Sequence, residues 1–155
     1  MTPNVSRLVV FTVEGSRYAV PLSSVERVLP MAAVRPVPGA PRVVLGAINL
    51  AGRVVPVVDL RRRLDLPSRD YGLSAHLLIV QTPRRTLALA ADETLGVAEV
   101  DPAMVAPTDV VLPGLGRVAG IAALPDGLLF IYDIEAFLTP QEERELGQAL
   151  GQVDG

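Results

Sequence analysis

No cysteine, no tryptophan and no lysine occur among the 155 residues, and there is a single histidine. The absence of cysteine excludes disulfides, thiolate metal ligands and cysteine nucleophiles, and it is compatible with a reducing compartment. Aromatic residues make up 4% of the chain, too few for a broad stacking platform that binds single-stranded nucleic acid. The formal net charge of −3 argues further against binding to a phosphate backbone.

Long uninterrupted hydrophobic runs are also missing, although 50% of the residues are hydrophobic. The apolar stretch at residues 45–64 is long enough for a membrane span, but it contains Asn49, Arg53 and Pro56. The first residues lack the charged start and sustained apolar segment of a signal peptide. The sequence therefore predicts a soluble cytoplasmic protein that buries a core of its own.

Residue patterns for catalysis or cofactor binding are lacking as well. His76 has no cysteine and no clustered carboxylates as partners, so we interpret it as structural or exposed. No serine lies in a G-x-S-x-G motif, and no phosphate-binding glycine loop is present. Asp92 and Glu93 are adjacent and would point to opposite faces of a strand. The run at residues 61–63 is interpreted as a solvated face, with a partner contact as the alternative. We therefore expect no enzymatic activity, no metal site and no cofactor.

Short runs rich in Val, Ile and Leu dominate what is present. Four pairs of such runs are typical of β-hairpins, because each pair is joined by a short segment that contains glycine or proline. The pairs are residues 7–13 with 17–22, 43–50 with 53–60, 76–82 with 86–92, and 118–124 with 128–134. Pro56 cannot donate to a sheet ladder, so its strand should lie at an edge or carry a bulge.

The remaining segments give other signals. Residues 139–150 begin with a capping box, Thr139 followed three positions later by Glu142, and predict a helix. Residues 23–29 fit a short helix or a strand equally well. The prolines in residues 30–42 predict an extended connector.

The two halves of the chain resemble each other. The first hairpin aligns with the third, 69 positions later, and Gly46 aligns with Gly120, 74 positions later. Units of ~60–70 residues have marginal cores alone, so they should pack together across a shared apolar seam. We therefore predict a mainly β fold of two small antiparallel barrels, with units at about 7–65 and 75–138 and a helix at about 139–150.

A longer constellation resembles a known family. The segment LGAINLAGRVVPVVDLRRRL, preceded by YAVPLSSVERVL and RPVPGAP, resembles the CheW family of bacterial chemosensory coupling proteins. LALAADETLGVAEV and DGLLFIYDIEAFL resemble later segments of that family, so the resemblance spans nearly the whole chain. The matching positions in the first half are Tyr18, Pro38, Pro41, Gly46, Asn49, Leu50, Gly52, Pro56, Asp59 and Leu60.

The resemblance implies two packed, five-stranded SH3-like β-barrels and an adaptor that needs no cofactor. Proteins of this kind link the cytoplasmic tips of methyl-accepting chemoreceptors to the regulatory domain of the histidine kinase CheA. No nucleic acid and no membrane insertion are implied. The alternative is a divergent CheW-like scaffold of another two-component pathway, for example one that controls gliding or pilus motility.

The sequence departs from the family pattern at two positions. The arginine of the family's N-L-R-G motif is Ala51 here, and the glutamate of V-x-E is displaced to Glu26, with Arg27 in its place. Because both charges change together, we expect no unpaired buried charge and altered receptor contacts. Several receptor-groove candidates also have a purely structural alternative: core packing for Val25 and Val97, turn or close-packing geometry for Gly46 and Gly52, and hydrogen bonding to the hairpin backbone for Asn49. The receptor-groove candidates implied by the resemblance are Val25, Arg27, Gly46, Asn49, Ala51, Gly52 and Val97.

Overall fold

The computed structural model describes residues 6–67, 70–107, 111–112, 116–135 and 137–154. The strands in this part of the chain are β1 (Ser6–Val13), β2 (Ser16–Pro21), β3 (Val25–Pro30), β4 (Val44–Leu50), β5 (Arg53–Asp59), β6 (His76–Gln81), β7 (Thr86–Ala91), β8 (Glu93–Val100), β9 (Val105–Pro107), β10 (Val111–Leu112), β11 (Gly116–Leu124) and β12 (Gly127–Tyr132). The helices are α1 (Leu60–Arg63) and α2 (Pro140–Asp154), with 3-10 turns η1 (Leu22–Ser24) and η2 (Pro102–Met104). The predicted mainly β class is confirmed.

All four predicted hairpins form: β1 pairs antiparallel with β2, β4 with β5, β6 with β7, and β11 with β12. The segment 23–29, which fitted a helix or a strand, contains the end of η1 followed by β3. Pro56 is tolerated on β5 because the ladder with β7 runs only from Val57 to Asp59. At Pro56 the strand therefore has β4 as its one ladder partner in the described chain.

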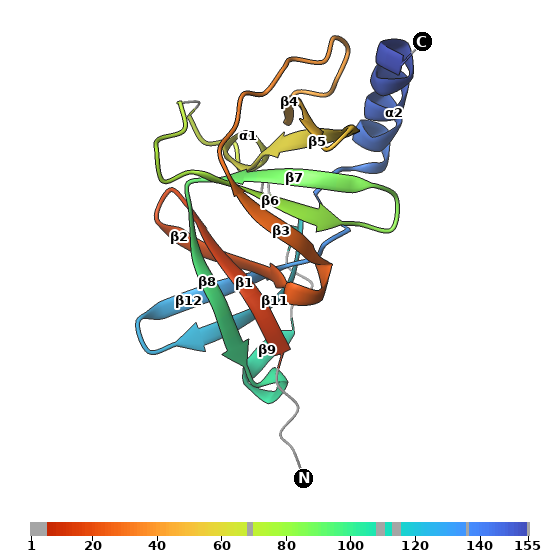
Figure 1. The fold of residues 1–155 in the computed structure, drawn as a ribbon. Coiled ribbons are helices and arrows are strands. Elements are labelled where there is room, and N and C mark those ends of the chain that lie inside the picture. The colour runs from red at the N-terminus through yellow and green to blue at the C-terminus, as the bar shows by residue number, and fades with distance from the viewer. Residues whose placement is uncertain (1–5, 68–69, 108–110, 113–115, 136, 155) are drawn as a thin grey trace.

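The strands form two sheets (Figure 1). Sheet A has the order β10-β11-β12-β2-β1-β8, with β9 also paired to β11, and sheet B has the order β3-β6-β7-β5-β4. Sheet A contains the β1–β2 hairpin of the first half beside strands of the second half, and sheet B contains the β6–β7 hairpin of the second half beside strands of the first half. The repeat units 7–65 and 75–138 therefore both contribute to both sheets. The short η1 turn accounts for this exchange, because it directs β3 away from β2 and into pairing with β6.

The sequence repeat also relates the two sheets to each other. β12 runs parallel to β2 as β5 runs parallel to β7, and β8 pairs with β1 as β3 pairs with β6. The β4–β5 ladder shifts register between Val44 and Gly46, and the β11–β12 ladder shifts between Val118 and Gly120. The glycines that align in the sequence therefore mark the same β-bulge in both sheets.

The central hairpins are buried on both faces, which explains their continuous apolar sequences. On β6, Leu77 and Ile79 face a cluster inside sheet B, whereas Leu78 and Val80 face a cluster between the sheets. We call these inner cluster B and the seam cluster, and we call the equivalent cluster inside sheet A inner cluster A. The seam cluster includes Val9, Phe11, Tyr18, Val20, Val58, Leu78, Val80, Leu87, Leu89, Phe137 and Leu146.

The C-terminal helix α2 begins with the predicted capping box. The Thr139 hydroxyl accepts from the Glu142 N–H at 3.1 Å, and a Glu142 carboxylate oxygen accepts from the Thr139 N–H at 2.8 Å. The helix continues to Asp154, beyond the predicted end at residue 150, and buries Leu146 and Ala149. Within the described ranges, no helix has the length and apolar character that crossing a membrane requires.

Candidate functional site

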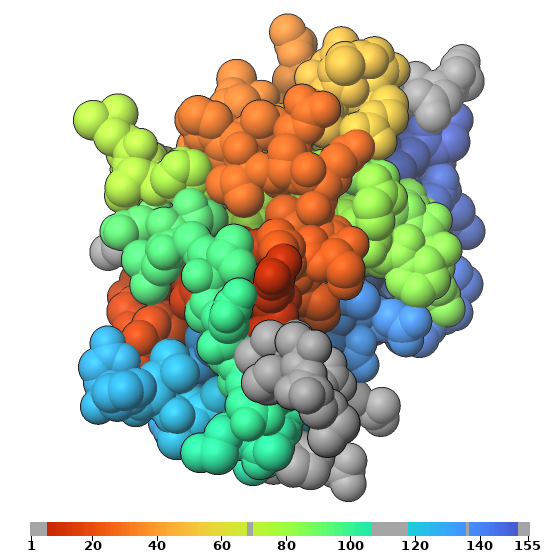
Figure 2. Space-filling view, turned by 60° about the horizontal axis from the view of Figure 1, so that its bottom comes forward, coloured from red at the N-terminus to blue at the C-terminus, as the bar shows by residue number. Residues whose placement is uncertain are grey.

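The candidate residues lie on or next to three edge strands, β3 and β4 at the two ends of sheet B and β8 at one end of sheet A. Within the described ranges, β3 pairs only with β6, and β8 pairs only with β1. In Figure 2 the red surface of β1 lies between the orange surface of the β3 region and the green surface of the β8 region. Val25 and Arg27 are on β3, Gly46 and Asn49 on β4, Ala51 and Gly52 in the β4–β5 turn, and Val97 on β8.

The β4–β5 turn has positive φ at both of its central residues. Ala51 has a φ of 51° and Gly52 a φ of 88°, the left-handed geometry of a type I′ hairpin turn. The Gly52 N–H donates to the side-chain oxygen of Asn49 over 2.8 Å. Asn49 and Gly52 therefore shape the turn, which holds the exposed Ala51 in a conformation that costs ~1 kcal/mol for an L-residue.

Gly46 is buried beneath the connector that follows β3. The backbones of Arg35 and Ala47 exchange two hydrogen bonds, of 3.0 and 2.8 Å. A Cβ atom at position 46 would lie 2.2 Å from the Arg35 carbonyl oxygen. Gly46 therefore allows the close approach of two backbones and adds no exposed side chain to the site.

The valines on the two edges point toward the opening of the seam. Val25 is partly buried against the seam cluster, whereas Val97 is 57% exposed. Val97 pairs with Val9 and Val28 pairs with Leu78, and both partners belong to the seam cluster. Because cross-strand partners share a face, Val28 and Val97 lie on the seam side of their strands. We call the exposed apolar side chains Val28, Leu95 and Val97, together with Val25 and Arg27, the β3–β8 surface.

A buried arginine ties the two sheets together. Arg61 of α1 is 1% exposed and donates to both carboxylate oxygens of Asp92, at 3.0 and 2.5 Å. It also forms an ion pair with Glu14 in the β1–β2 turn of sheet A. The interpretation of residues 61–63 as a solvated face is therefore wrong for Arg61, and Arg63 is paired with Glu142 of α2. The exchange of hairpins explains the error, because it brings the β1–β2 turn against α1.

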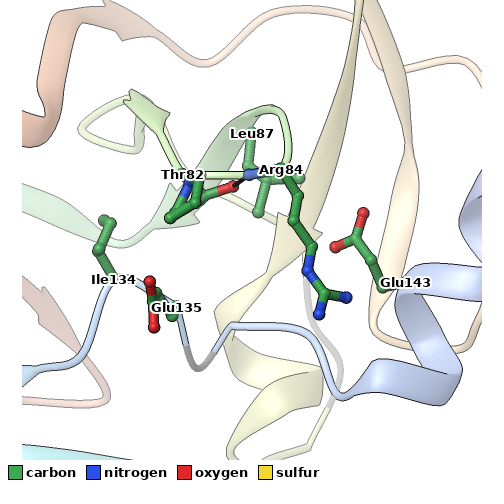
Figure 3. Close-up of a pocket in the computed structure, with 7 residues that line it drawn as sticks. Thr82, Arg84, Leu87, Ile134, Glu135 and Glu143 are labelled. Atoms are coloured by element: carbon green, nitrogen blue, oxygen red, sulfur yellow. Dashed lines mark hydrogen bonds between the residues drawn. The ribbon is translucent and has the colours of Figure 1, made fainter.

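A cavity of about 220 Å³ lies between the β6–β7 turn, the segment after β12 and α2 (Figure 3). Figure 3 shows Arg84 extending from the turn toward Glu143 of α2, with Glu135 across the cavity. Glu143 is ion-paired with Arg85. The cavity is thus lined by charges of both signs. Among the residues that the structure describes, no group of three or more His, Cys, Asp or Glu side chains could hold a metal ion.

Residues 7–142 match the family model of the CheW-like domain. The chain belongs to the CheW family. It is 26% identical over 140 residues to the chemotaxis protein CheW of Rhizobium meliloti, which covers 89% of this chain and 90% of that protein. It is 30% identical over 106 residues to the protein FrzA of Myxococcus xanthus, covering 68% of this chain and 63% of that protein. The crystal structure of the scaffolding protein TtCheW from Thermoanaerobacter tengcongensis matches with a TM-score of 0.76 at 25% identity, over 86% of this chain and 90% of that chain.

Membership of the CheW family confirms the resemblance inferred from the sequence and the non-enzymatic class that it implied. The match to a solved CheW structure confirms the architecture of two packed β-sheet units with a short C-terminal helix. The seven receptor-groove residues remain predictions, and the structure divides them by geometry. Those on β3, in the β4–β5 turn and on β8 carry exposed surface, as does Asn49 near the end of β4, whereas Gly46 lies under the connector.

The structure corrects one expectation about the CheW charge pattern. With Ala51 in place of the family's arginine and Glu26 displaced, the charge pair was expected to be lost. Instead, the Arg53 guanidinium donates to both carboxylate oxygens of Glu26, at 3.1 and 2.9 Å. A register shift between Val25 and Arg27 places Glu26 in the bulge of β3, within reach of Arg53 at the start of β5. An ion pair thus joins the β4–β5 turn to β3. Its arginine lies two positions after, and its glutamate one position before, the positions of these charges in the family pattern.

Proposed function

We propose that this CheW-family chain is a non-enzymatic adaptor that couples the cytoplasmic tips of methyl-accepting chemoreceptors to a CheA-type histidine kinase. The observation that carries the proposal is the family match over residues 7–142, combined with an apolar surface at two sheet edges. Val28, Leu95 and Val97 are 38%, 49% and 57% exposed there. Exposed apolar residues that gather at sheet edges are typical of protein-binding surfaces.

The receptor tip would lie on the β3–β8 surface. Val25, Arg27 and Val97 supply side chains to it, while Asn49, Ala51 and Gly52 form the turn that the Arg53–Glu26 pair holds against β3. Gly46 contributes by letting the connector pack on β4. A surface of this kind needs no cofactor, because an adaptor transmits a signal through differences in binding free energy between receptor states.

A second candidate function within the family is a scaffold for a non-flagellar two-component pathway. The relocated Arg53–Glu26 pair and the uncharged Ala51 favour it, because both alter the charges that a receptor tip would meet. In either pathway we propose that the protein acts in the cytoplasm.

Calorimetric titrations with two partners test the proposal. The full chain is titrated with the CheW-like regulatory domain of a CheA kinase from the same organism, and separately with a receptor-tip helical hairpin. Saturable one-to-one binding to both partners is expected for the coupling adaptor. Kinase binding with no receptor binding would favour the scaffold of another pathway. Absence of binding to every CheA regulatory domain of that organism would overturn the proposal.

A further inference from the structure

The repeat creates two corresponding junctions, each between a hairpin turn and the segment that follows a strand of the other sheet. We call the meeting of the β1–β2 turn with α1 the first junction, and the meeting of the β6–β7 turn with the segment after β12 the second junction. The two turns correspond at an offset of 69 positions, and Arg61 of α1 corresponds to Glu135 at an offset of 74. The second junction contains the cavity of about 220 Å³.

Two charged side chains of the cavity wall are left without a partner. Arg84 lies in the β6–β7 turn and Glu135 in the segment after β12, and both are exposed. Among the residues that the structure describes, neither side chain forms a hydrogen bond or an ion pair. Glu143, which also lines the cavity, is already paired with Arg85. In the described part of the chain the wall therefore presents an unpaired cation and an unpaired anion.

The cavity separates these two charges and has an apolar inner wall. Figure 3 shows Arg84 on one side of the cavity and Glu135 on the other, with Leu87 and Ile134 between the turn and the segment. Leu87 belongs to the seam cluster, and Ile134 packs against it. Because a cavity of about 150 Å³ can hold a benzene molecule, the volume here suffices for a branched aliphatic side chain with a small polar head.

The first junction shows the same arrangement in its closed form. There the cation Arg61 follows β5 and is ion-paired with the anion Glu14 in the β1–β2 turn. In the second junction the signs are reversed, since the anion follows β12 and the cation lies in the turn. Tyr18 lines the first junction, and the corresponding residue in the second is the smaller Leu87. The second junction thus lacks apolar volume and keeps apart a charge pair that the first junction closes.

We propose that this cavity binds a free α-amino acid with an aliphatic side chain, such as leucine. The ligand carboxylate accepts from the Arg84 guanidinium, whose planar fork matches a carboxylate. The ligand ammonium donates to the Glu135 carboxylate, and the aliphatic side chain contacts Leu87 and Ile134. A zwitterion matches both unpaired charges at once, whereas the uncharged backbone of a protein segment would match neither. The site does not depend on the proposed adaptor function.

Titration of the full chain with leucine at low salt tests the site. Methyl NMR signals of Leu87 and Ile134 should shift saturably, while those of Val13 and Leu60 in the first junction stay in place. Two analogues each lack one charge: 4-methylpentanoate has no ammonium group, and 3-methylbutylamine has no carboxylate. Each should bind at least fivefold more weakly than leucine, and so should alanine, which lacks the aliphatic side chain. Absence of a saturable shift up to the solubility limit of leucine, or equal affinities for leucine and both analogues, would overturn the site.

Two variants assign the ligand charges to their residues. Glu135→Gln and Arg84→Gln each remove one charge from an exposed position, so both proteins should remain folded. Glu135→Gln should bind leucine and 4-methylpentanoate equally, whereas Arg84→Gln should bind leucine and 3-methylbutylamine equally. Arg144→Gln, at an exposed position of α2 outside the cavity wall, is the control and should leave the affinity for leucine unchanged. The reverse pattern, or unchanged preferences in both cavity variants, would overturn the assignment.

A third variant tests the place of the aliphatic side chain. Leu87→Tyr restores the residue type found in the first junction and should fill the cavity, so leucine should bind at least tenfold more weakly. Unchanged signals of Val9 and Leu78 in the seam cluster are the check on folding. A folded Leu87→Tyr protein that binds leucine as tightly as the unmodified chain would overturn the site. If Leu87→Tyr does not fold, the two charge variants still decide.

Discussion

Two junctions in the molecule occupy corresponding positions of the repeat and are built differently. In the first, the β1–β2 hairpin meets α1, and Arg61 is buried there against Glu14 and Asp92. In the second, the β6–β7 hairpin meets the segment after β12, and the residue corresponding to Arg61 is the exposed Glu135. The first junction leaves a void of about 10 Å³, whereas the second leaves the cavity of about 220 Å³ shown in Figure 3.

Two side-chain differences account for this contrast. Tyr18 lines the first junction, and the corresponding residue in the second, 69 positions later, is the smaller Leu87. The cation Arg61, which draws two carboxylates together, is replaced by an anion at position 135. The backbone repeat thus offers two similar junctions, and residue size and charge at two positions decide that one is filled and fixes the sheets while the other stays open.

Removing the buried Arg61 should lower the free energy of unfolding more than the matching change at the second junction. Arg61→Met leaves the carboxylates of Glu14 and Asp92 facing each other without their cation, so the free energy of unfolding should fall by about 3 kcal/mol. Glu135→Met, at the corresponding exposed position, should change it by less than about 0.5 kcal/mol. Urea unfolding of the two variants at neutral pH measures both values. Equal effects would show that the junctions do not differ as described.

The two bulge glycines should also respond unequally to a methyl group. A Cβ at Gly46 would lie 2.2 Å from a backbone oxygen of Arg35, whereas a Cβ at Gly120 would lie 2.5 Å from a side-chain methyl of Val105. Since a side chain can rotate and a bridged backbone cannot, we expect Gly46→Ala to cost about 3 kcal/mol and Gly120→Ala about 1 kcal/mol. Thermal and urea unfolding of both variants check the order; a larger loss for Gly120→Ala would contradict it.

Tyr71 packs against inner cluster B, and its hydroxyl donates to a carboxylate oxygen of Asp59. Tyr71→Phe removes the hydroxyl but keeps the ring, so it should cost about 1 kcal/mol at pH 7. The folded pKa of Tyr71 lies above its unfolded value of ~10, so its contribution is complete below pH 10 and is lost as the pH rises further. Between pH 7 and pH 11, the free energy of unfolding should therefore fall less for Tyr71→Phe than for the unmodified chain. A parallel loss in both proteins would mean that Tyr71 does not titrate during unfolding.

The parts of the fold that local sequence determines were predicted well. The four hairpins follow from alternating or continuous apolar runs with turn residues between them, and the helix cap follows from Thr139 and Glu142. The alignment of Gly46 with Gly120 predicted a repeat, which the structure shows as the same bulge in both sheets. These features depend on contacts between residues close in the chain or in adjacent strands.

The contacts that depend on the exchange of hairpins were not predictable in this way. Arg61 finds its partners 47 and 31 residues away, on segments that only the exchange brings to α1. The Arg53–Glu26 pair spans 27 residues and requires a one-residue bulge in β3. Neither separation leaves a periodic signal in the sequence, so a charged run was mistaken for a solvated face and a relocated charge pair for a lost one.

The ion pairs at the two hairpin turns should give the smallest effects on stability and the clearest difference in function. Arg53 joins the β4–β5 turn to Glu26, and Asp126 joins the β11–β12 turn to Arg17 at 3.0 Å. Both pairs are partly exposed, so Arg53→Ala and Arg17→Ala should each lower the free energy of unfolding by less than about 1 kcal/mol. In Arg17→Ala the pKa of Asp126, which the Arg17 guanidinium now holds below its ordinary value, should rise, as NMR titration would show. Only Arg53→Ala should weaken binding of the receptor hairpin, because only that pair borders the β3–β8 surface. Exchanging the charges with Glu26→Arg and Arg53→Glu should restore stability while still altering receptor affinity, and full recovery of both would assign the pair to the fold alone.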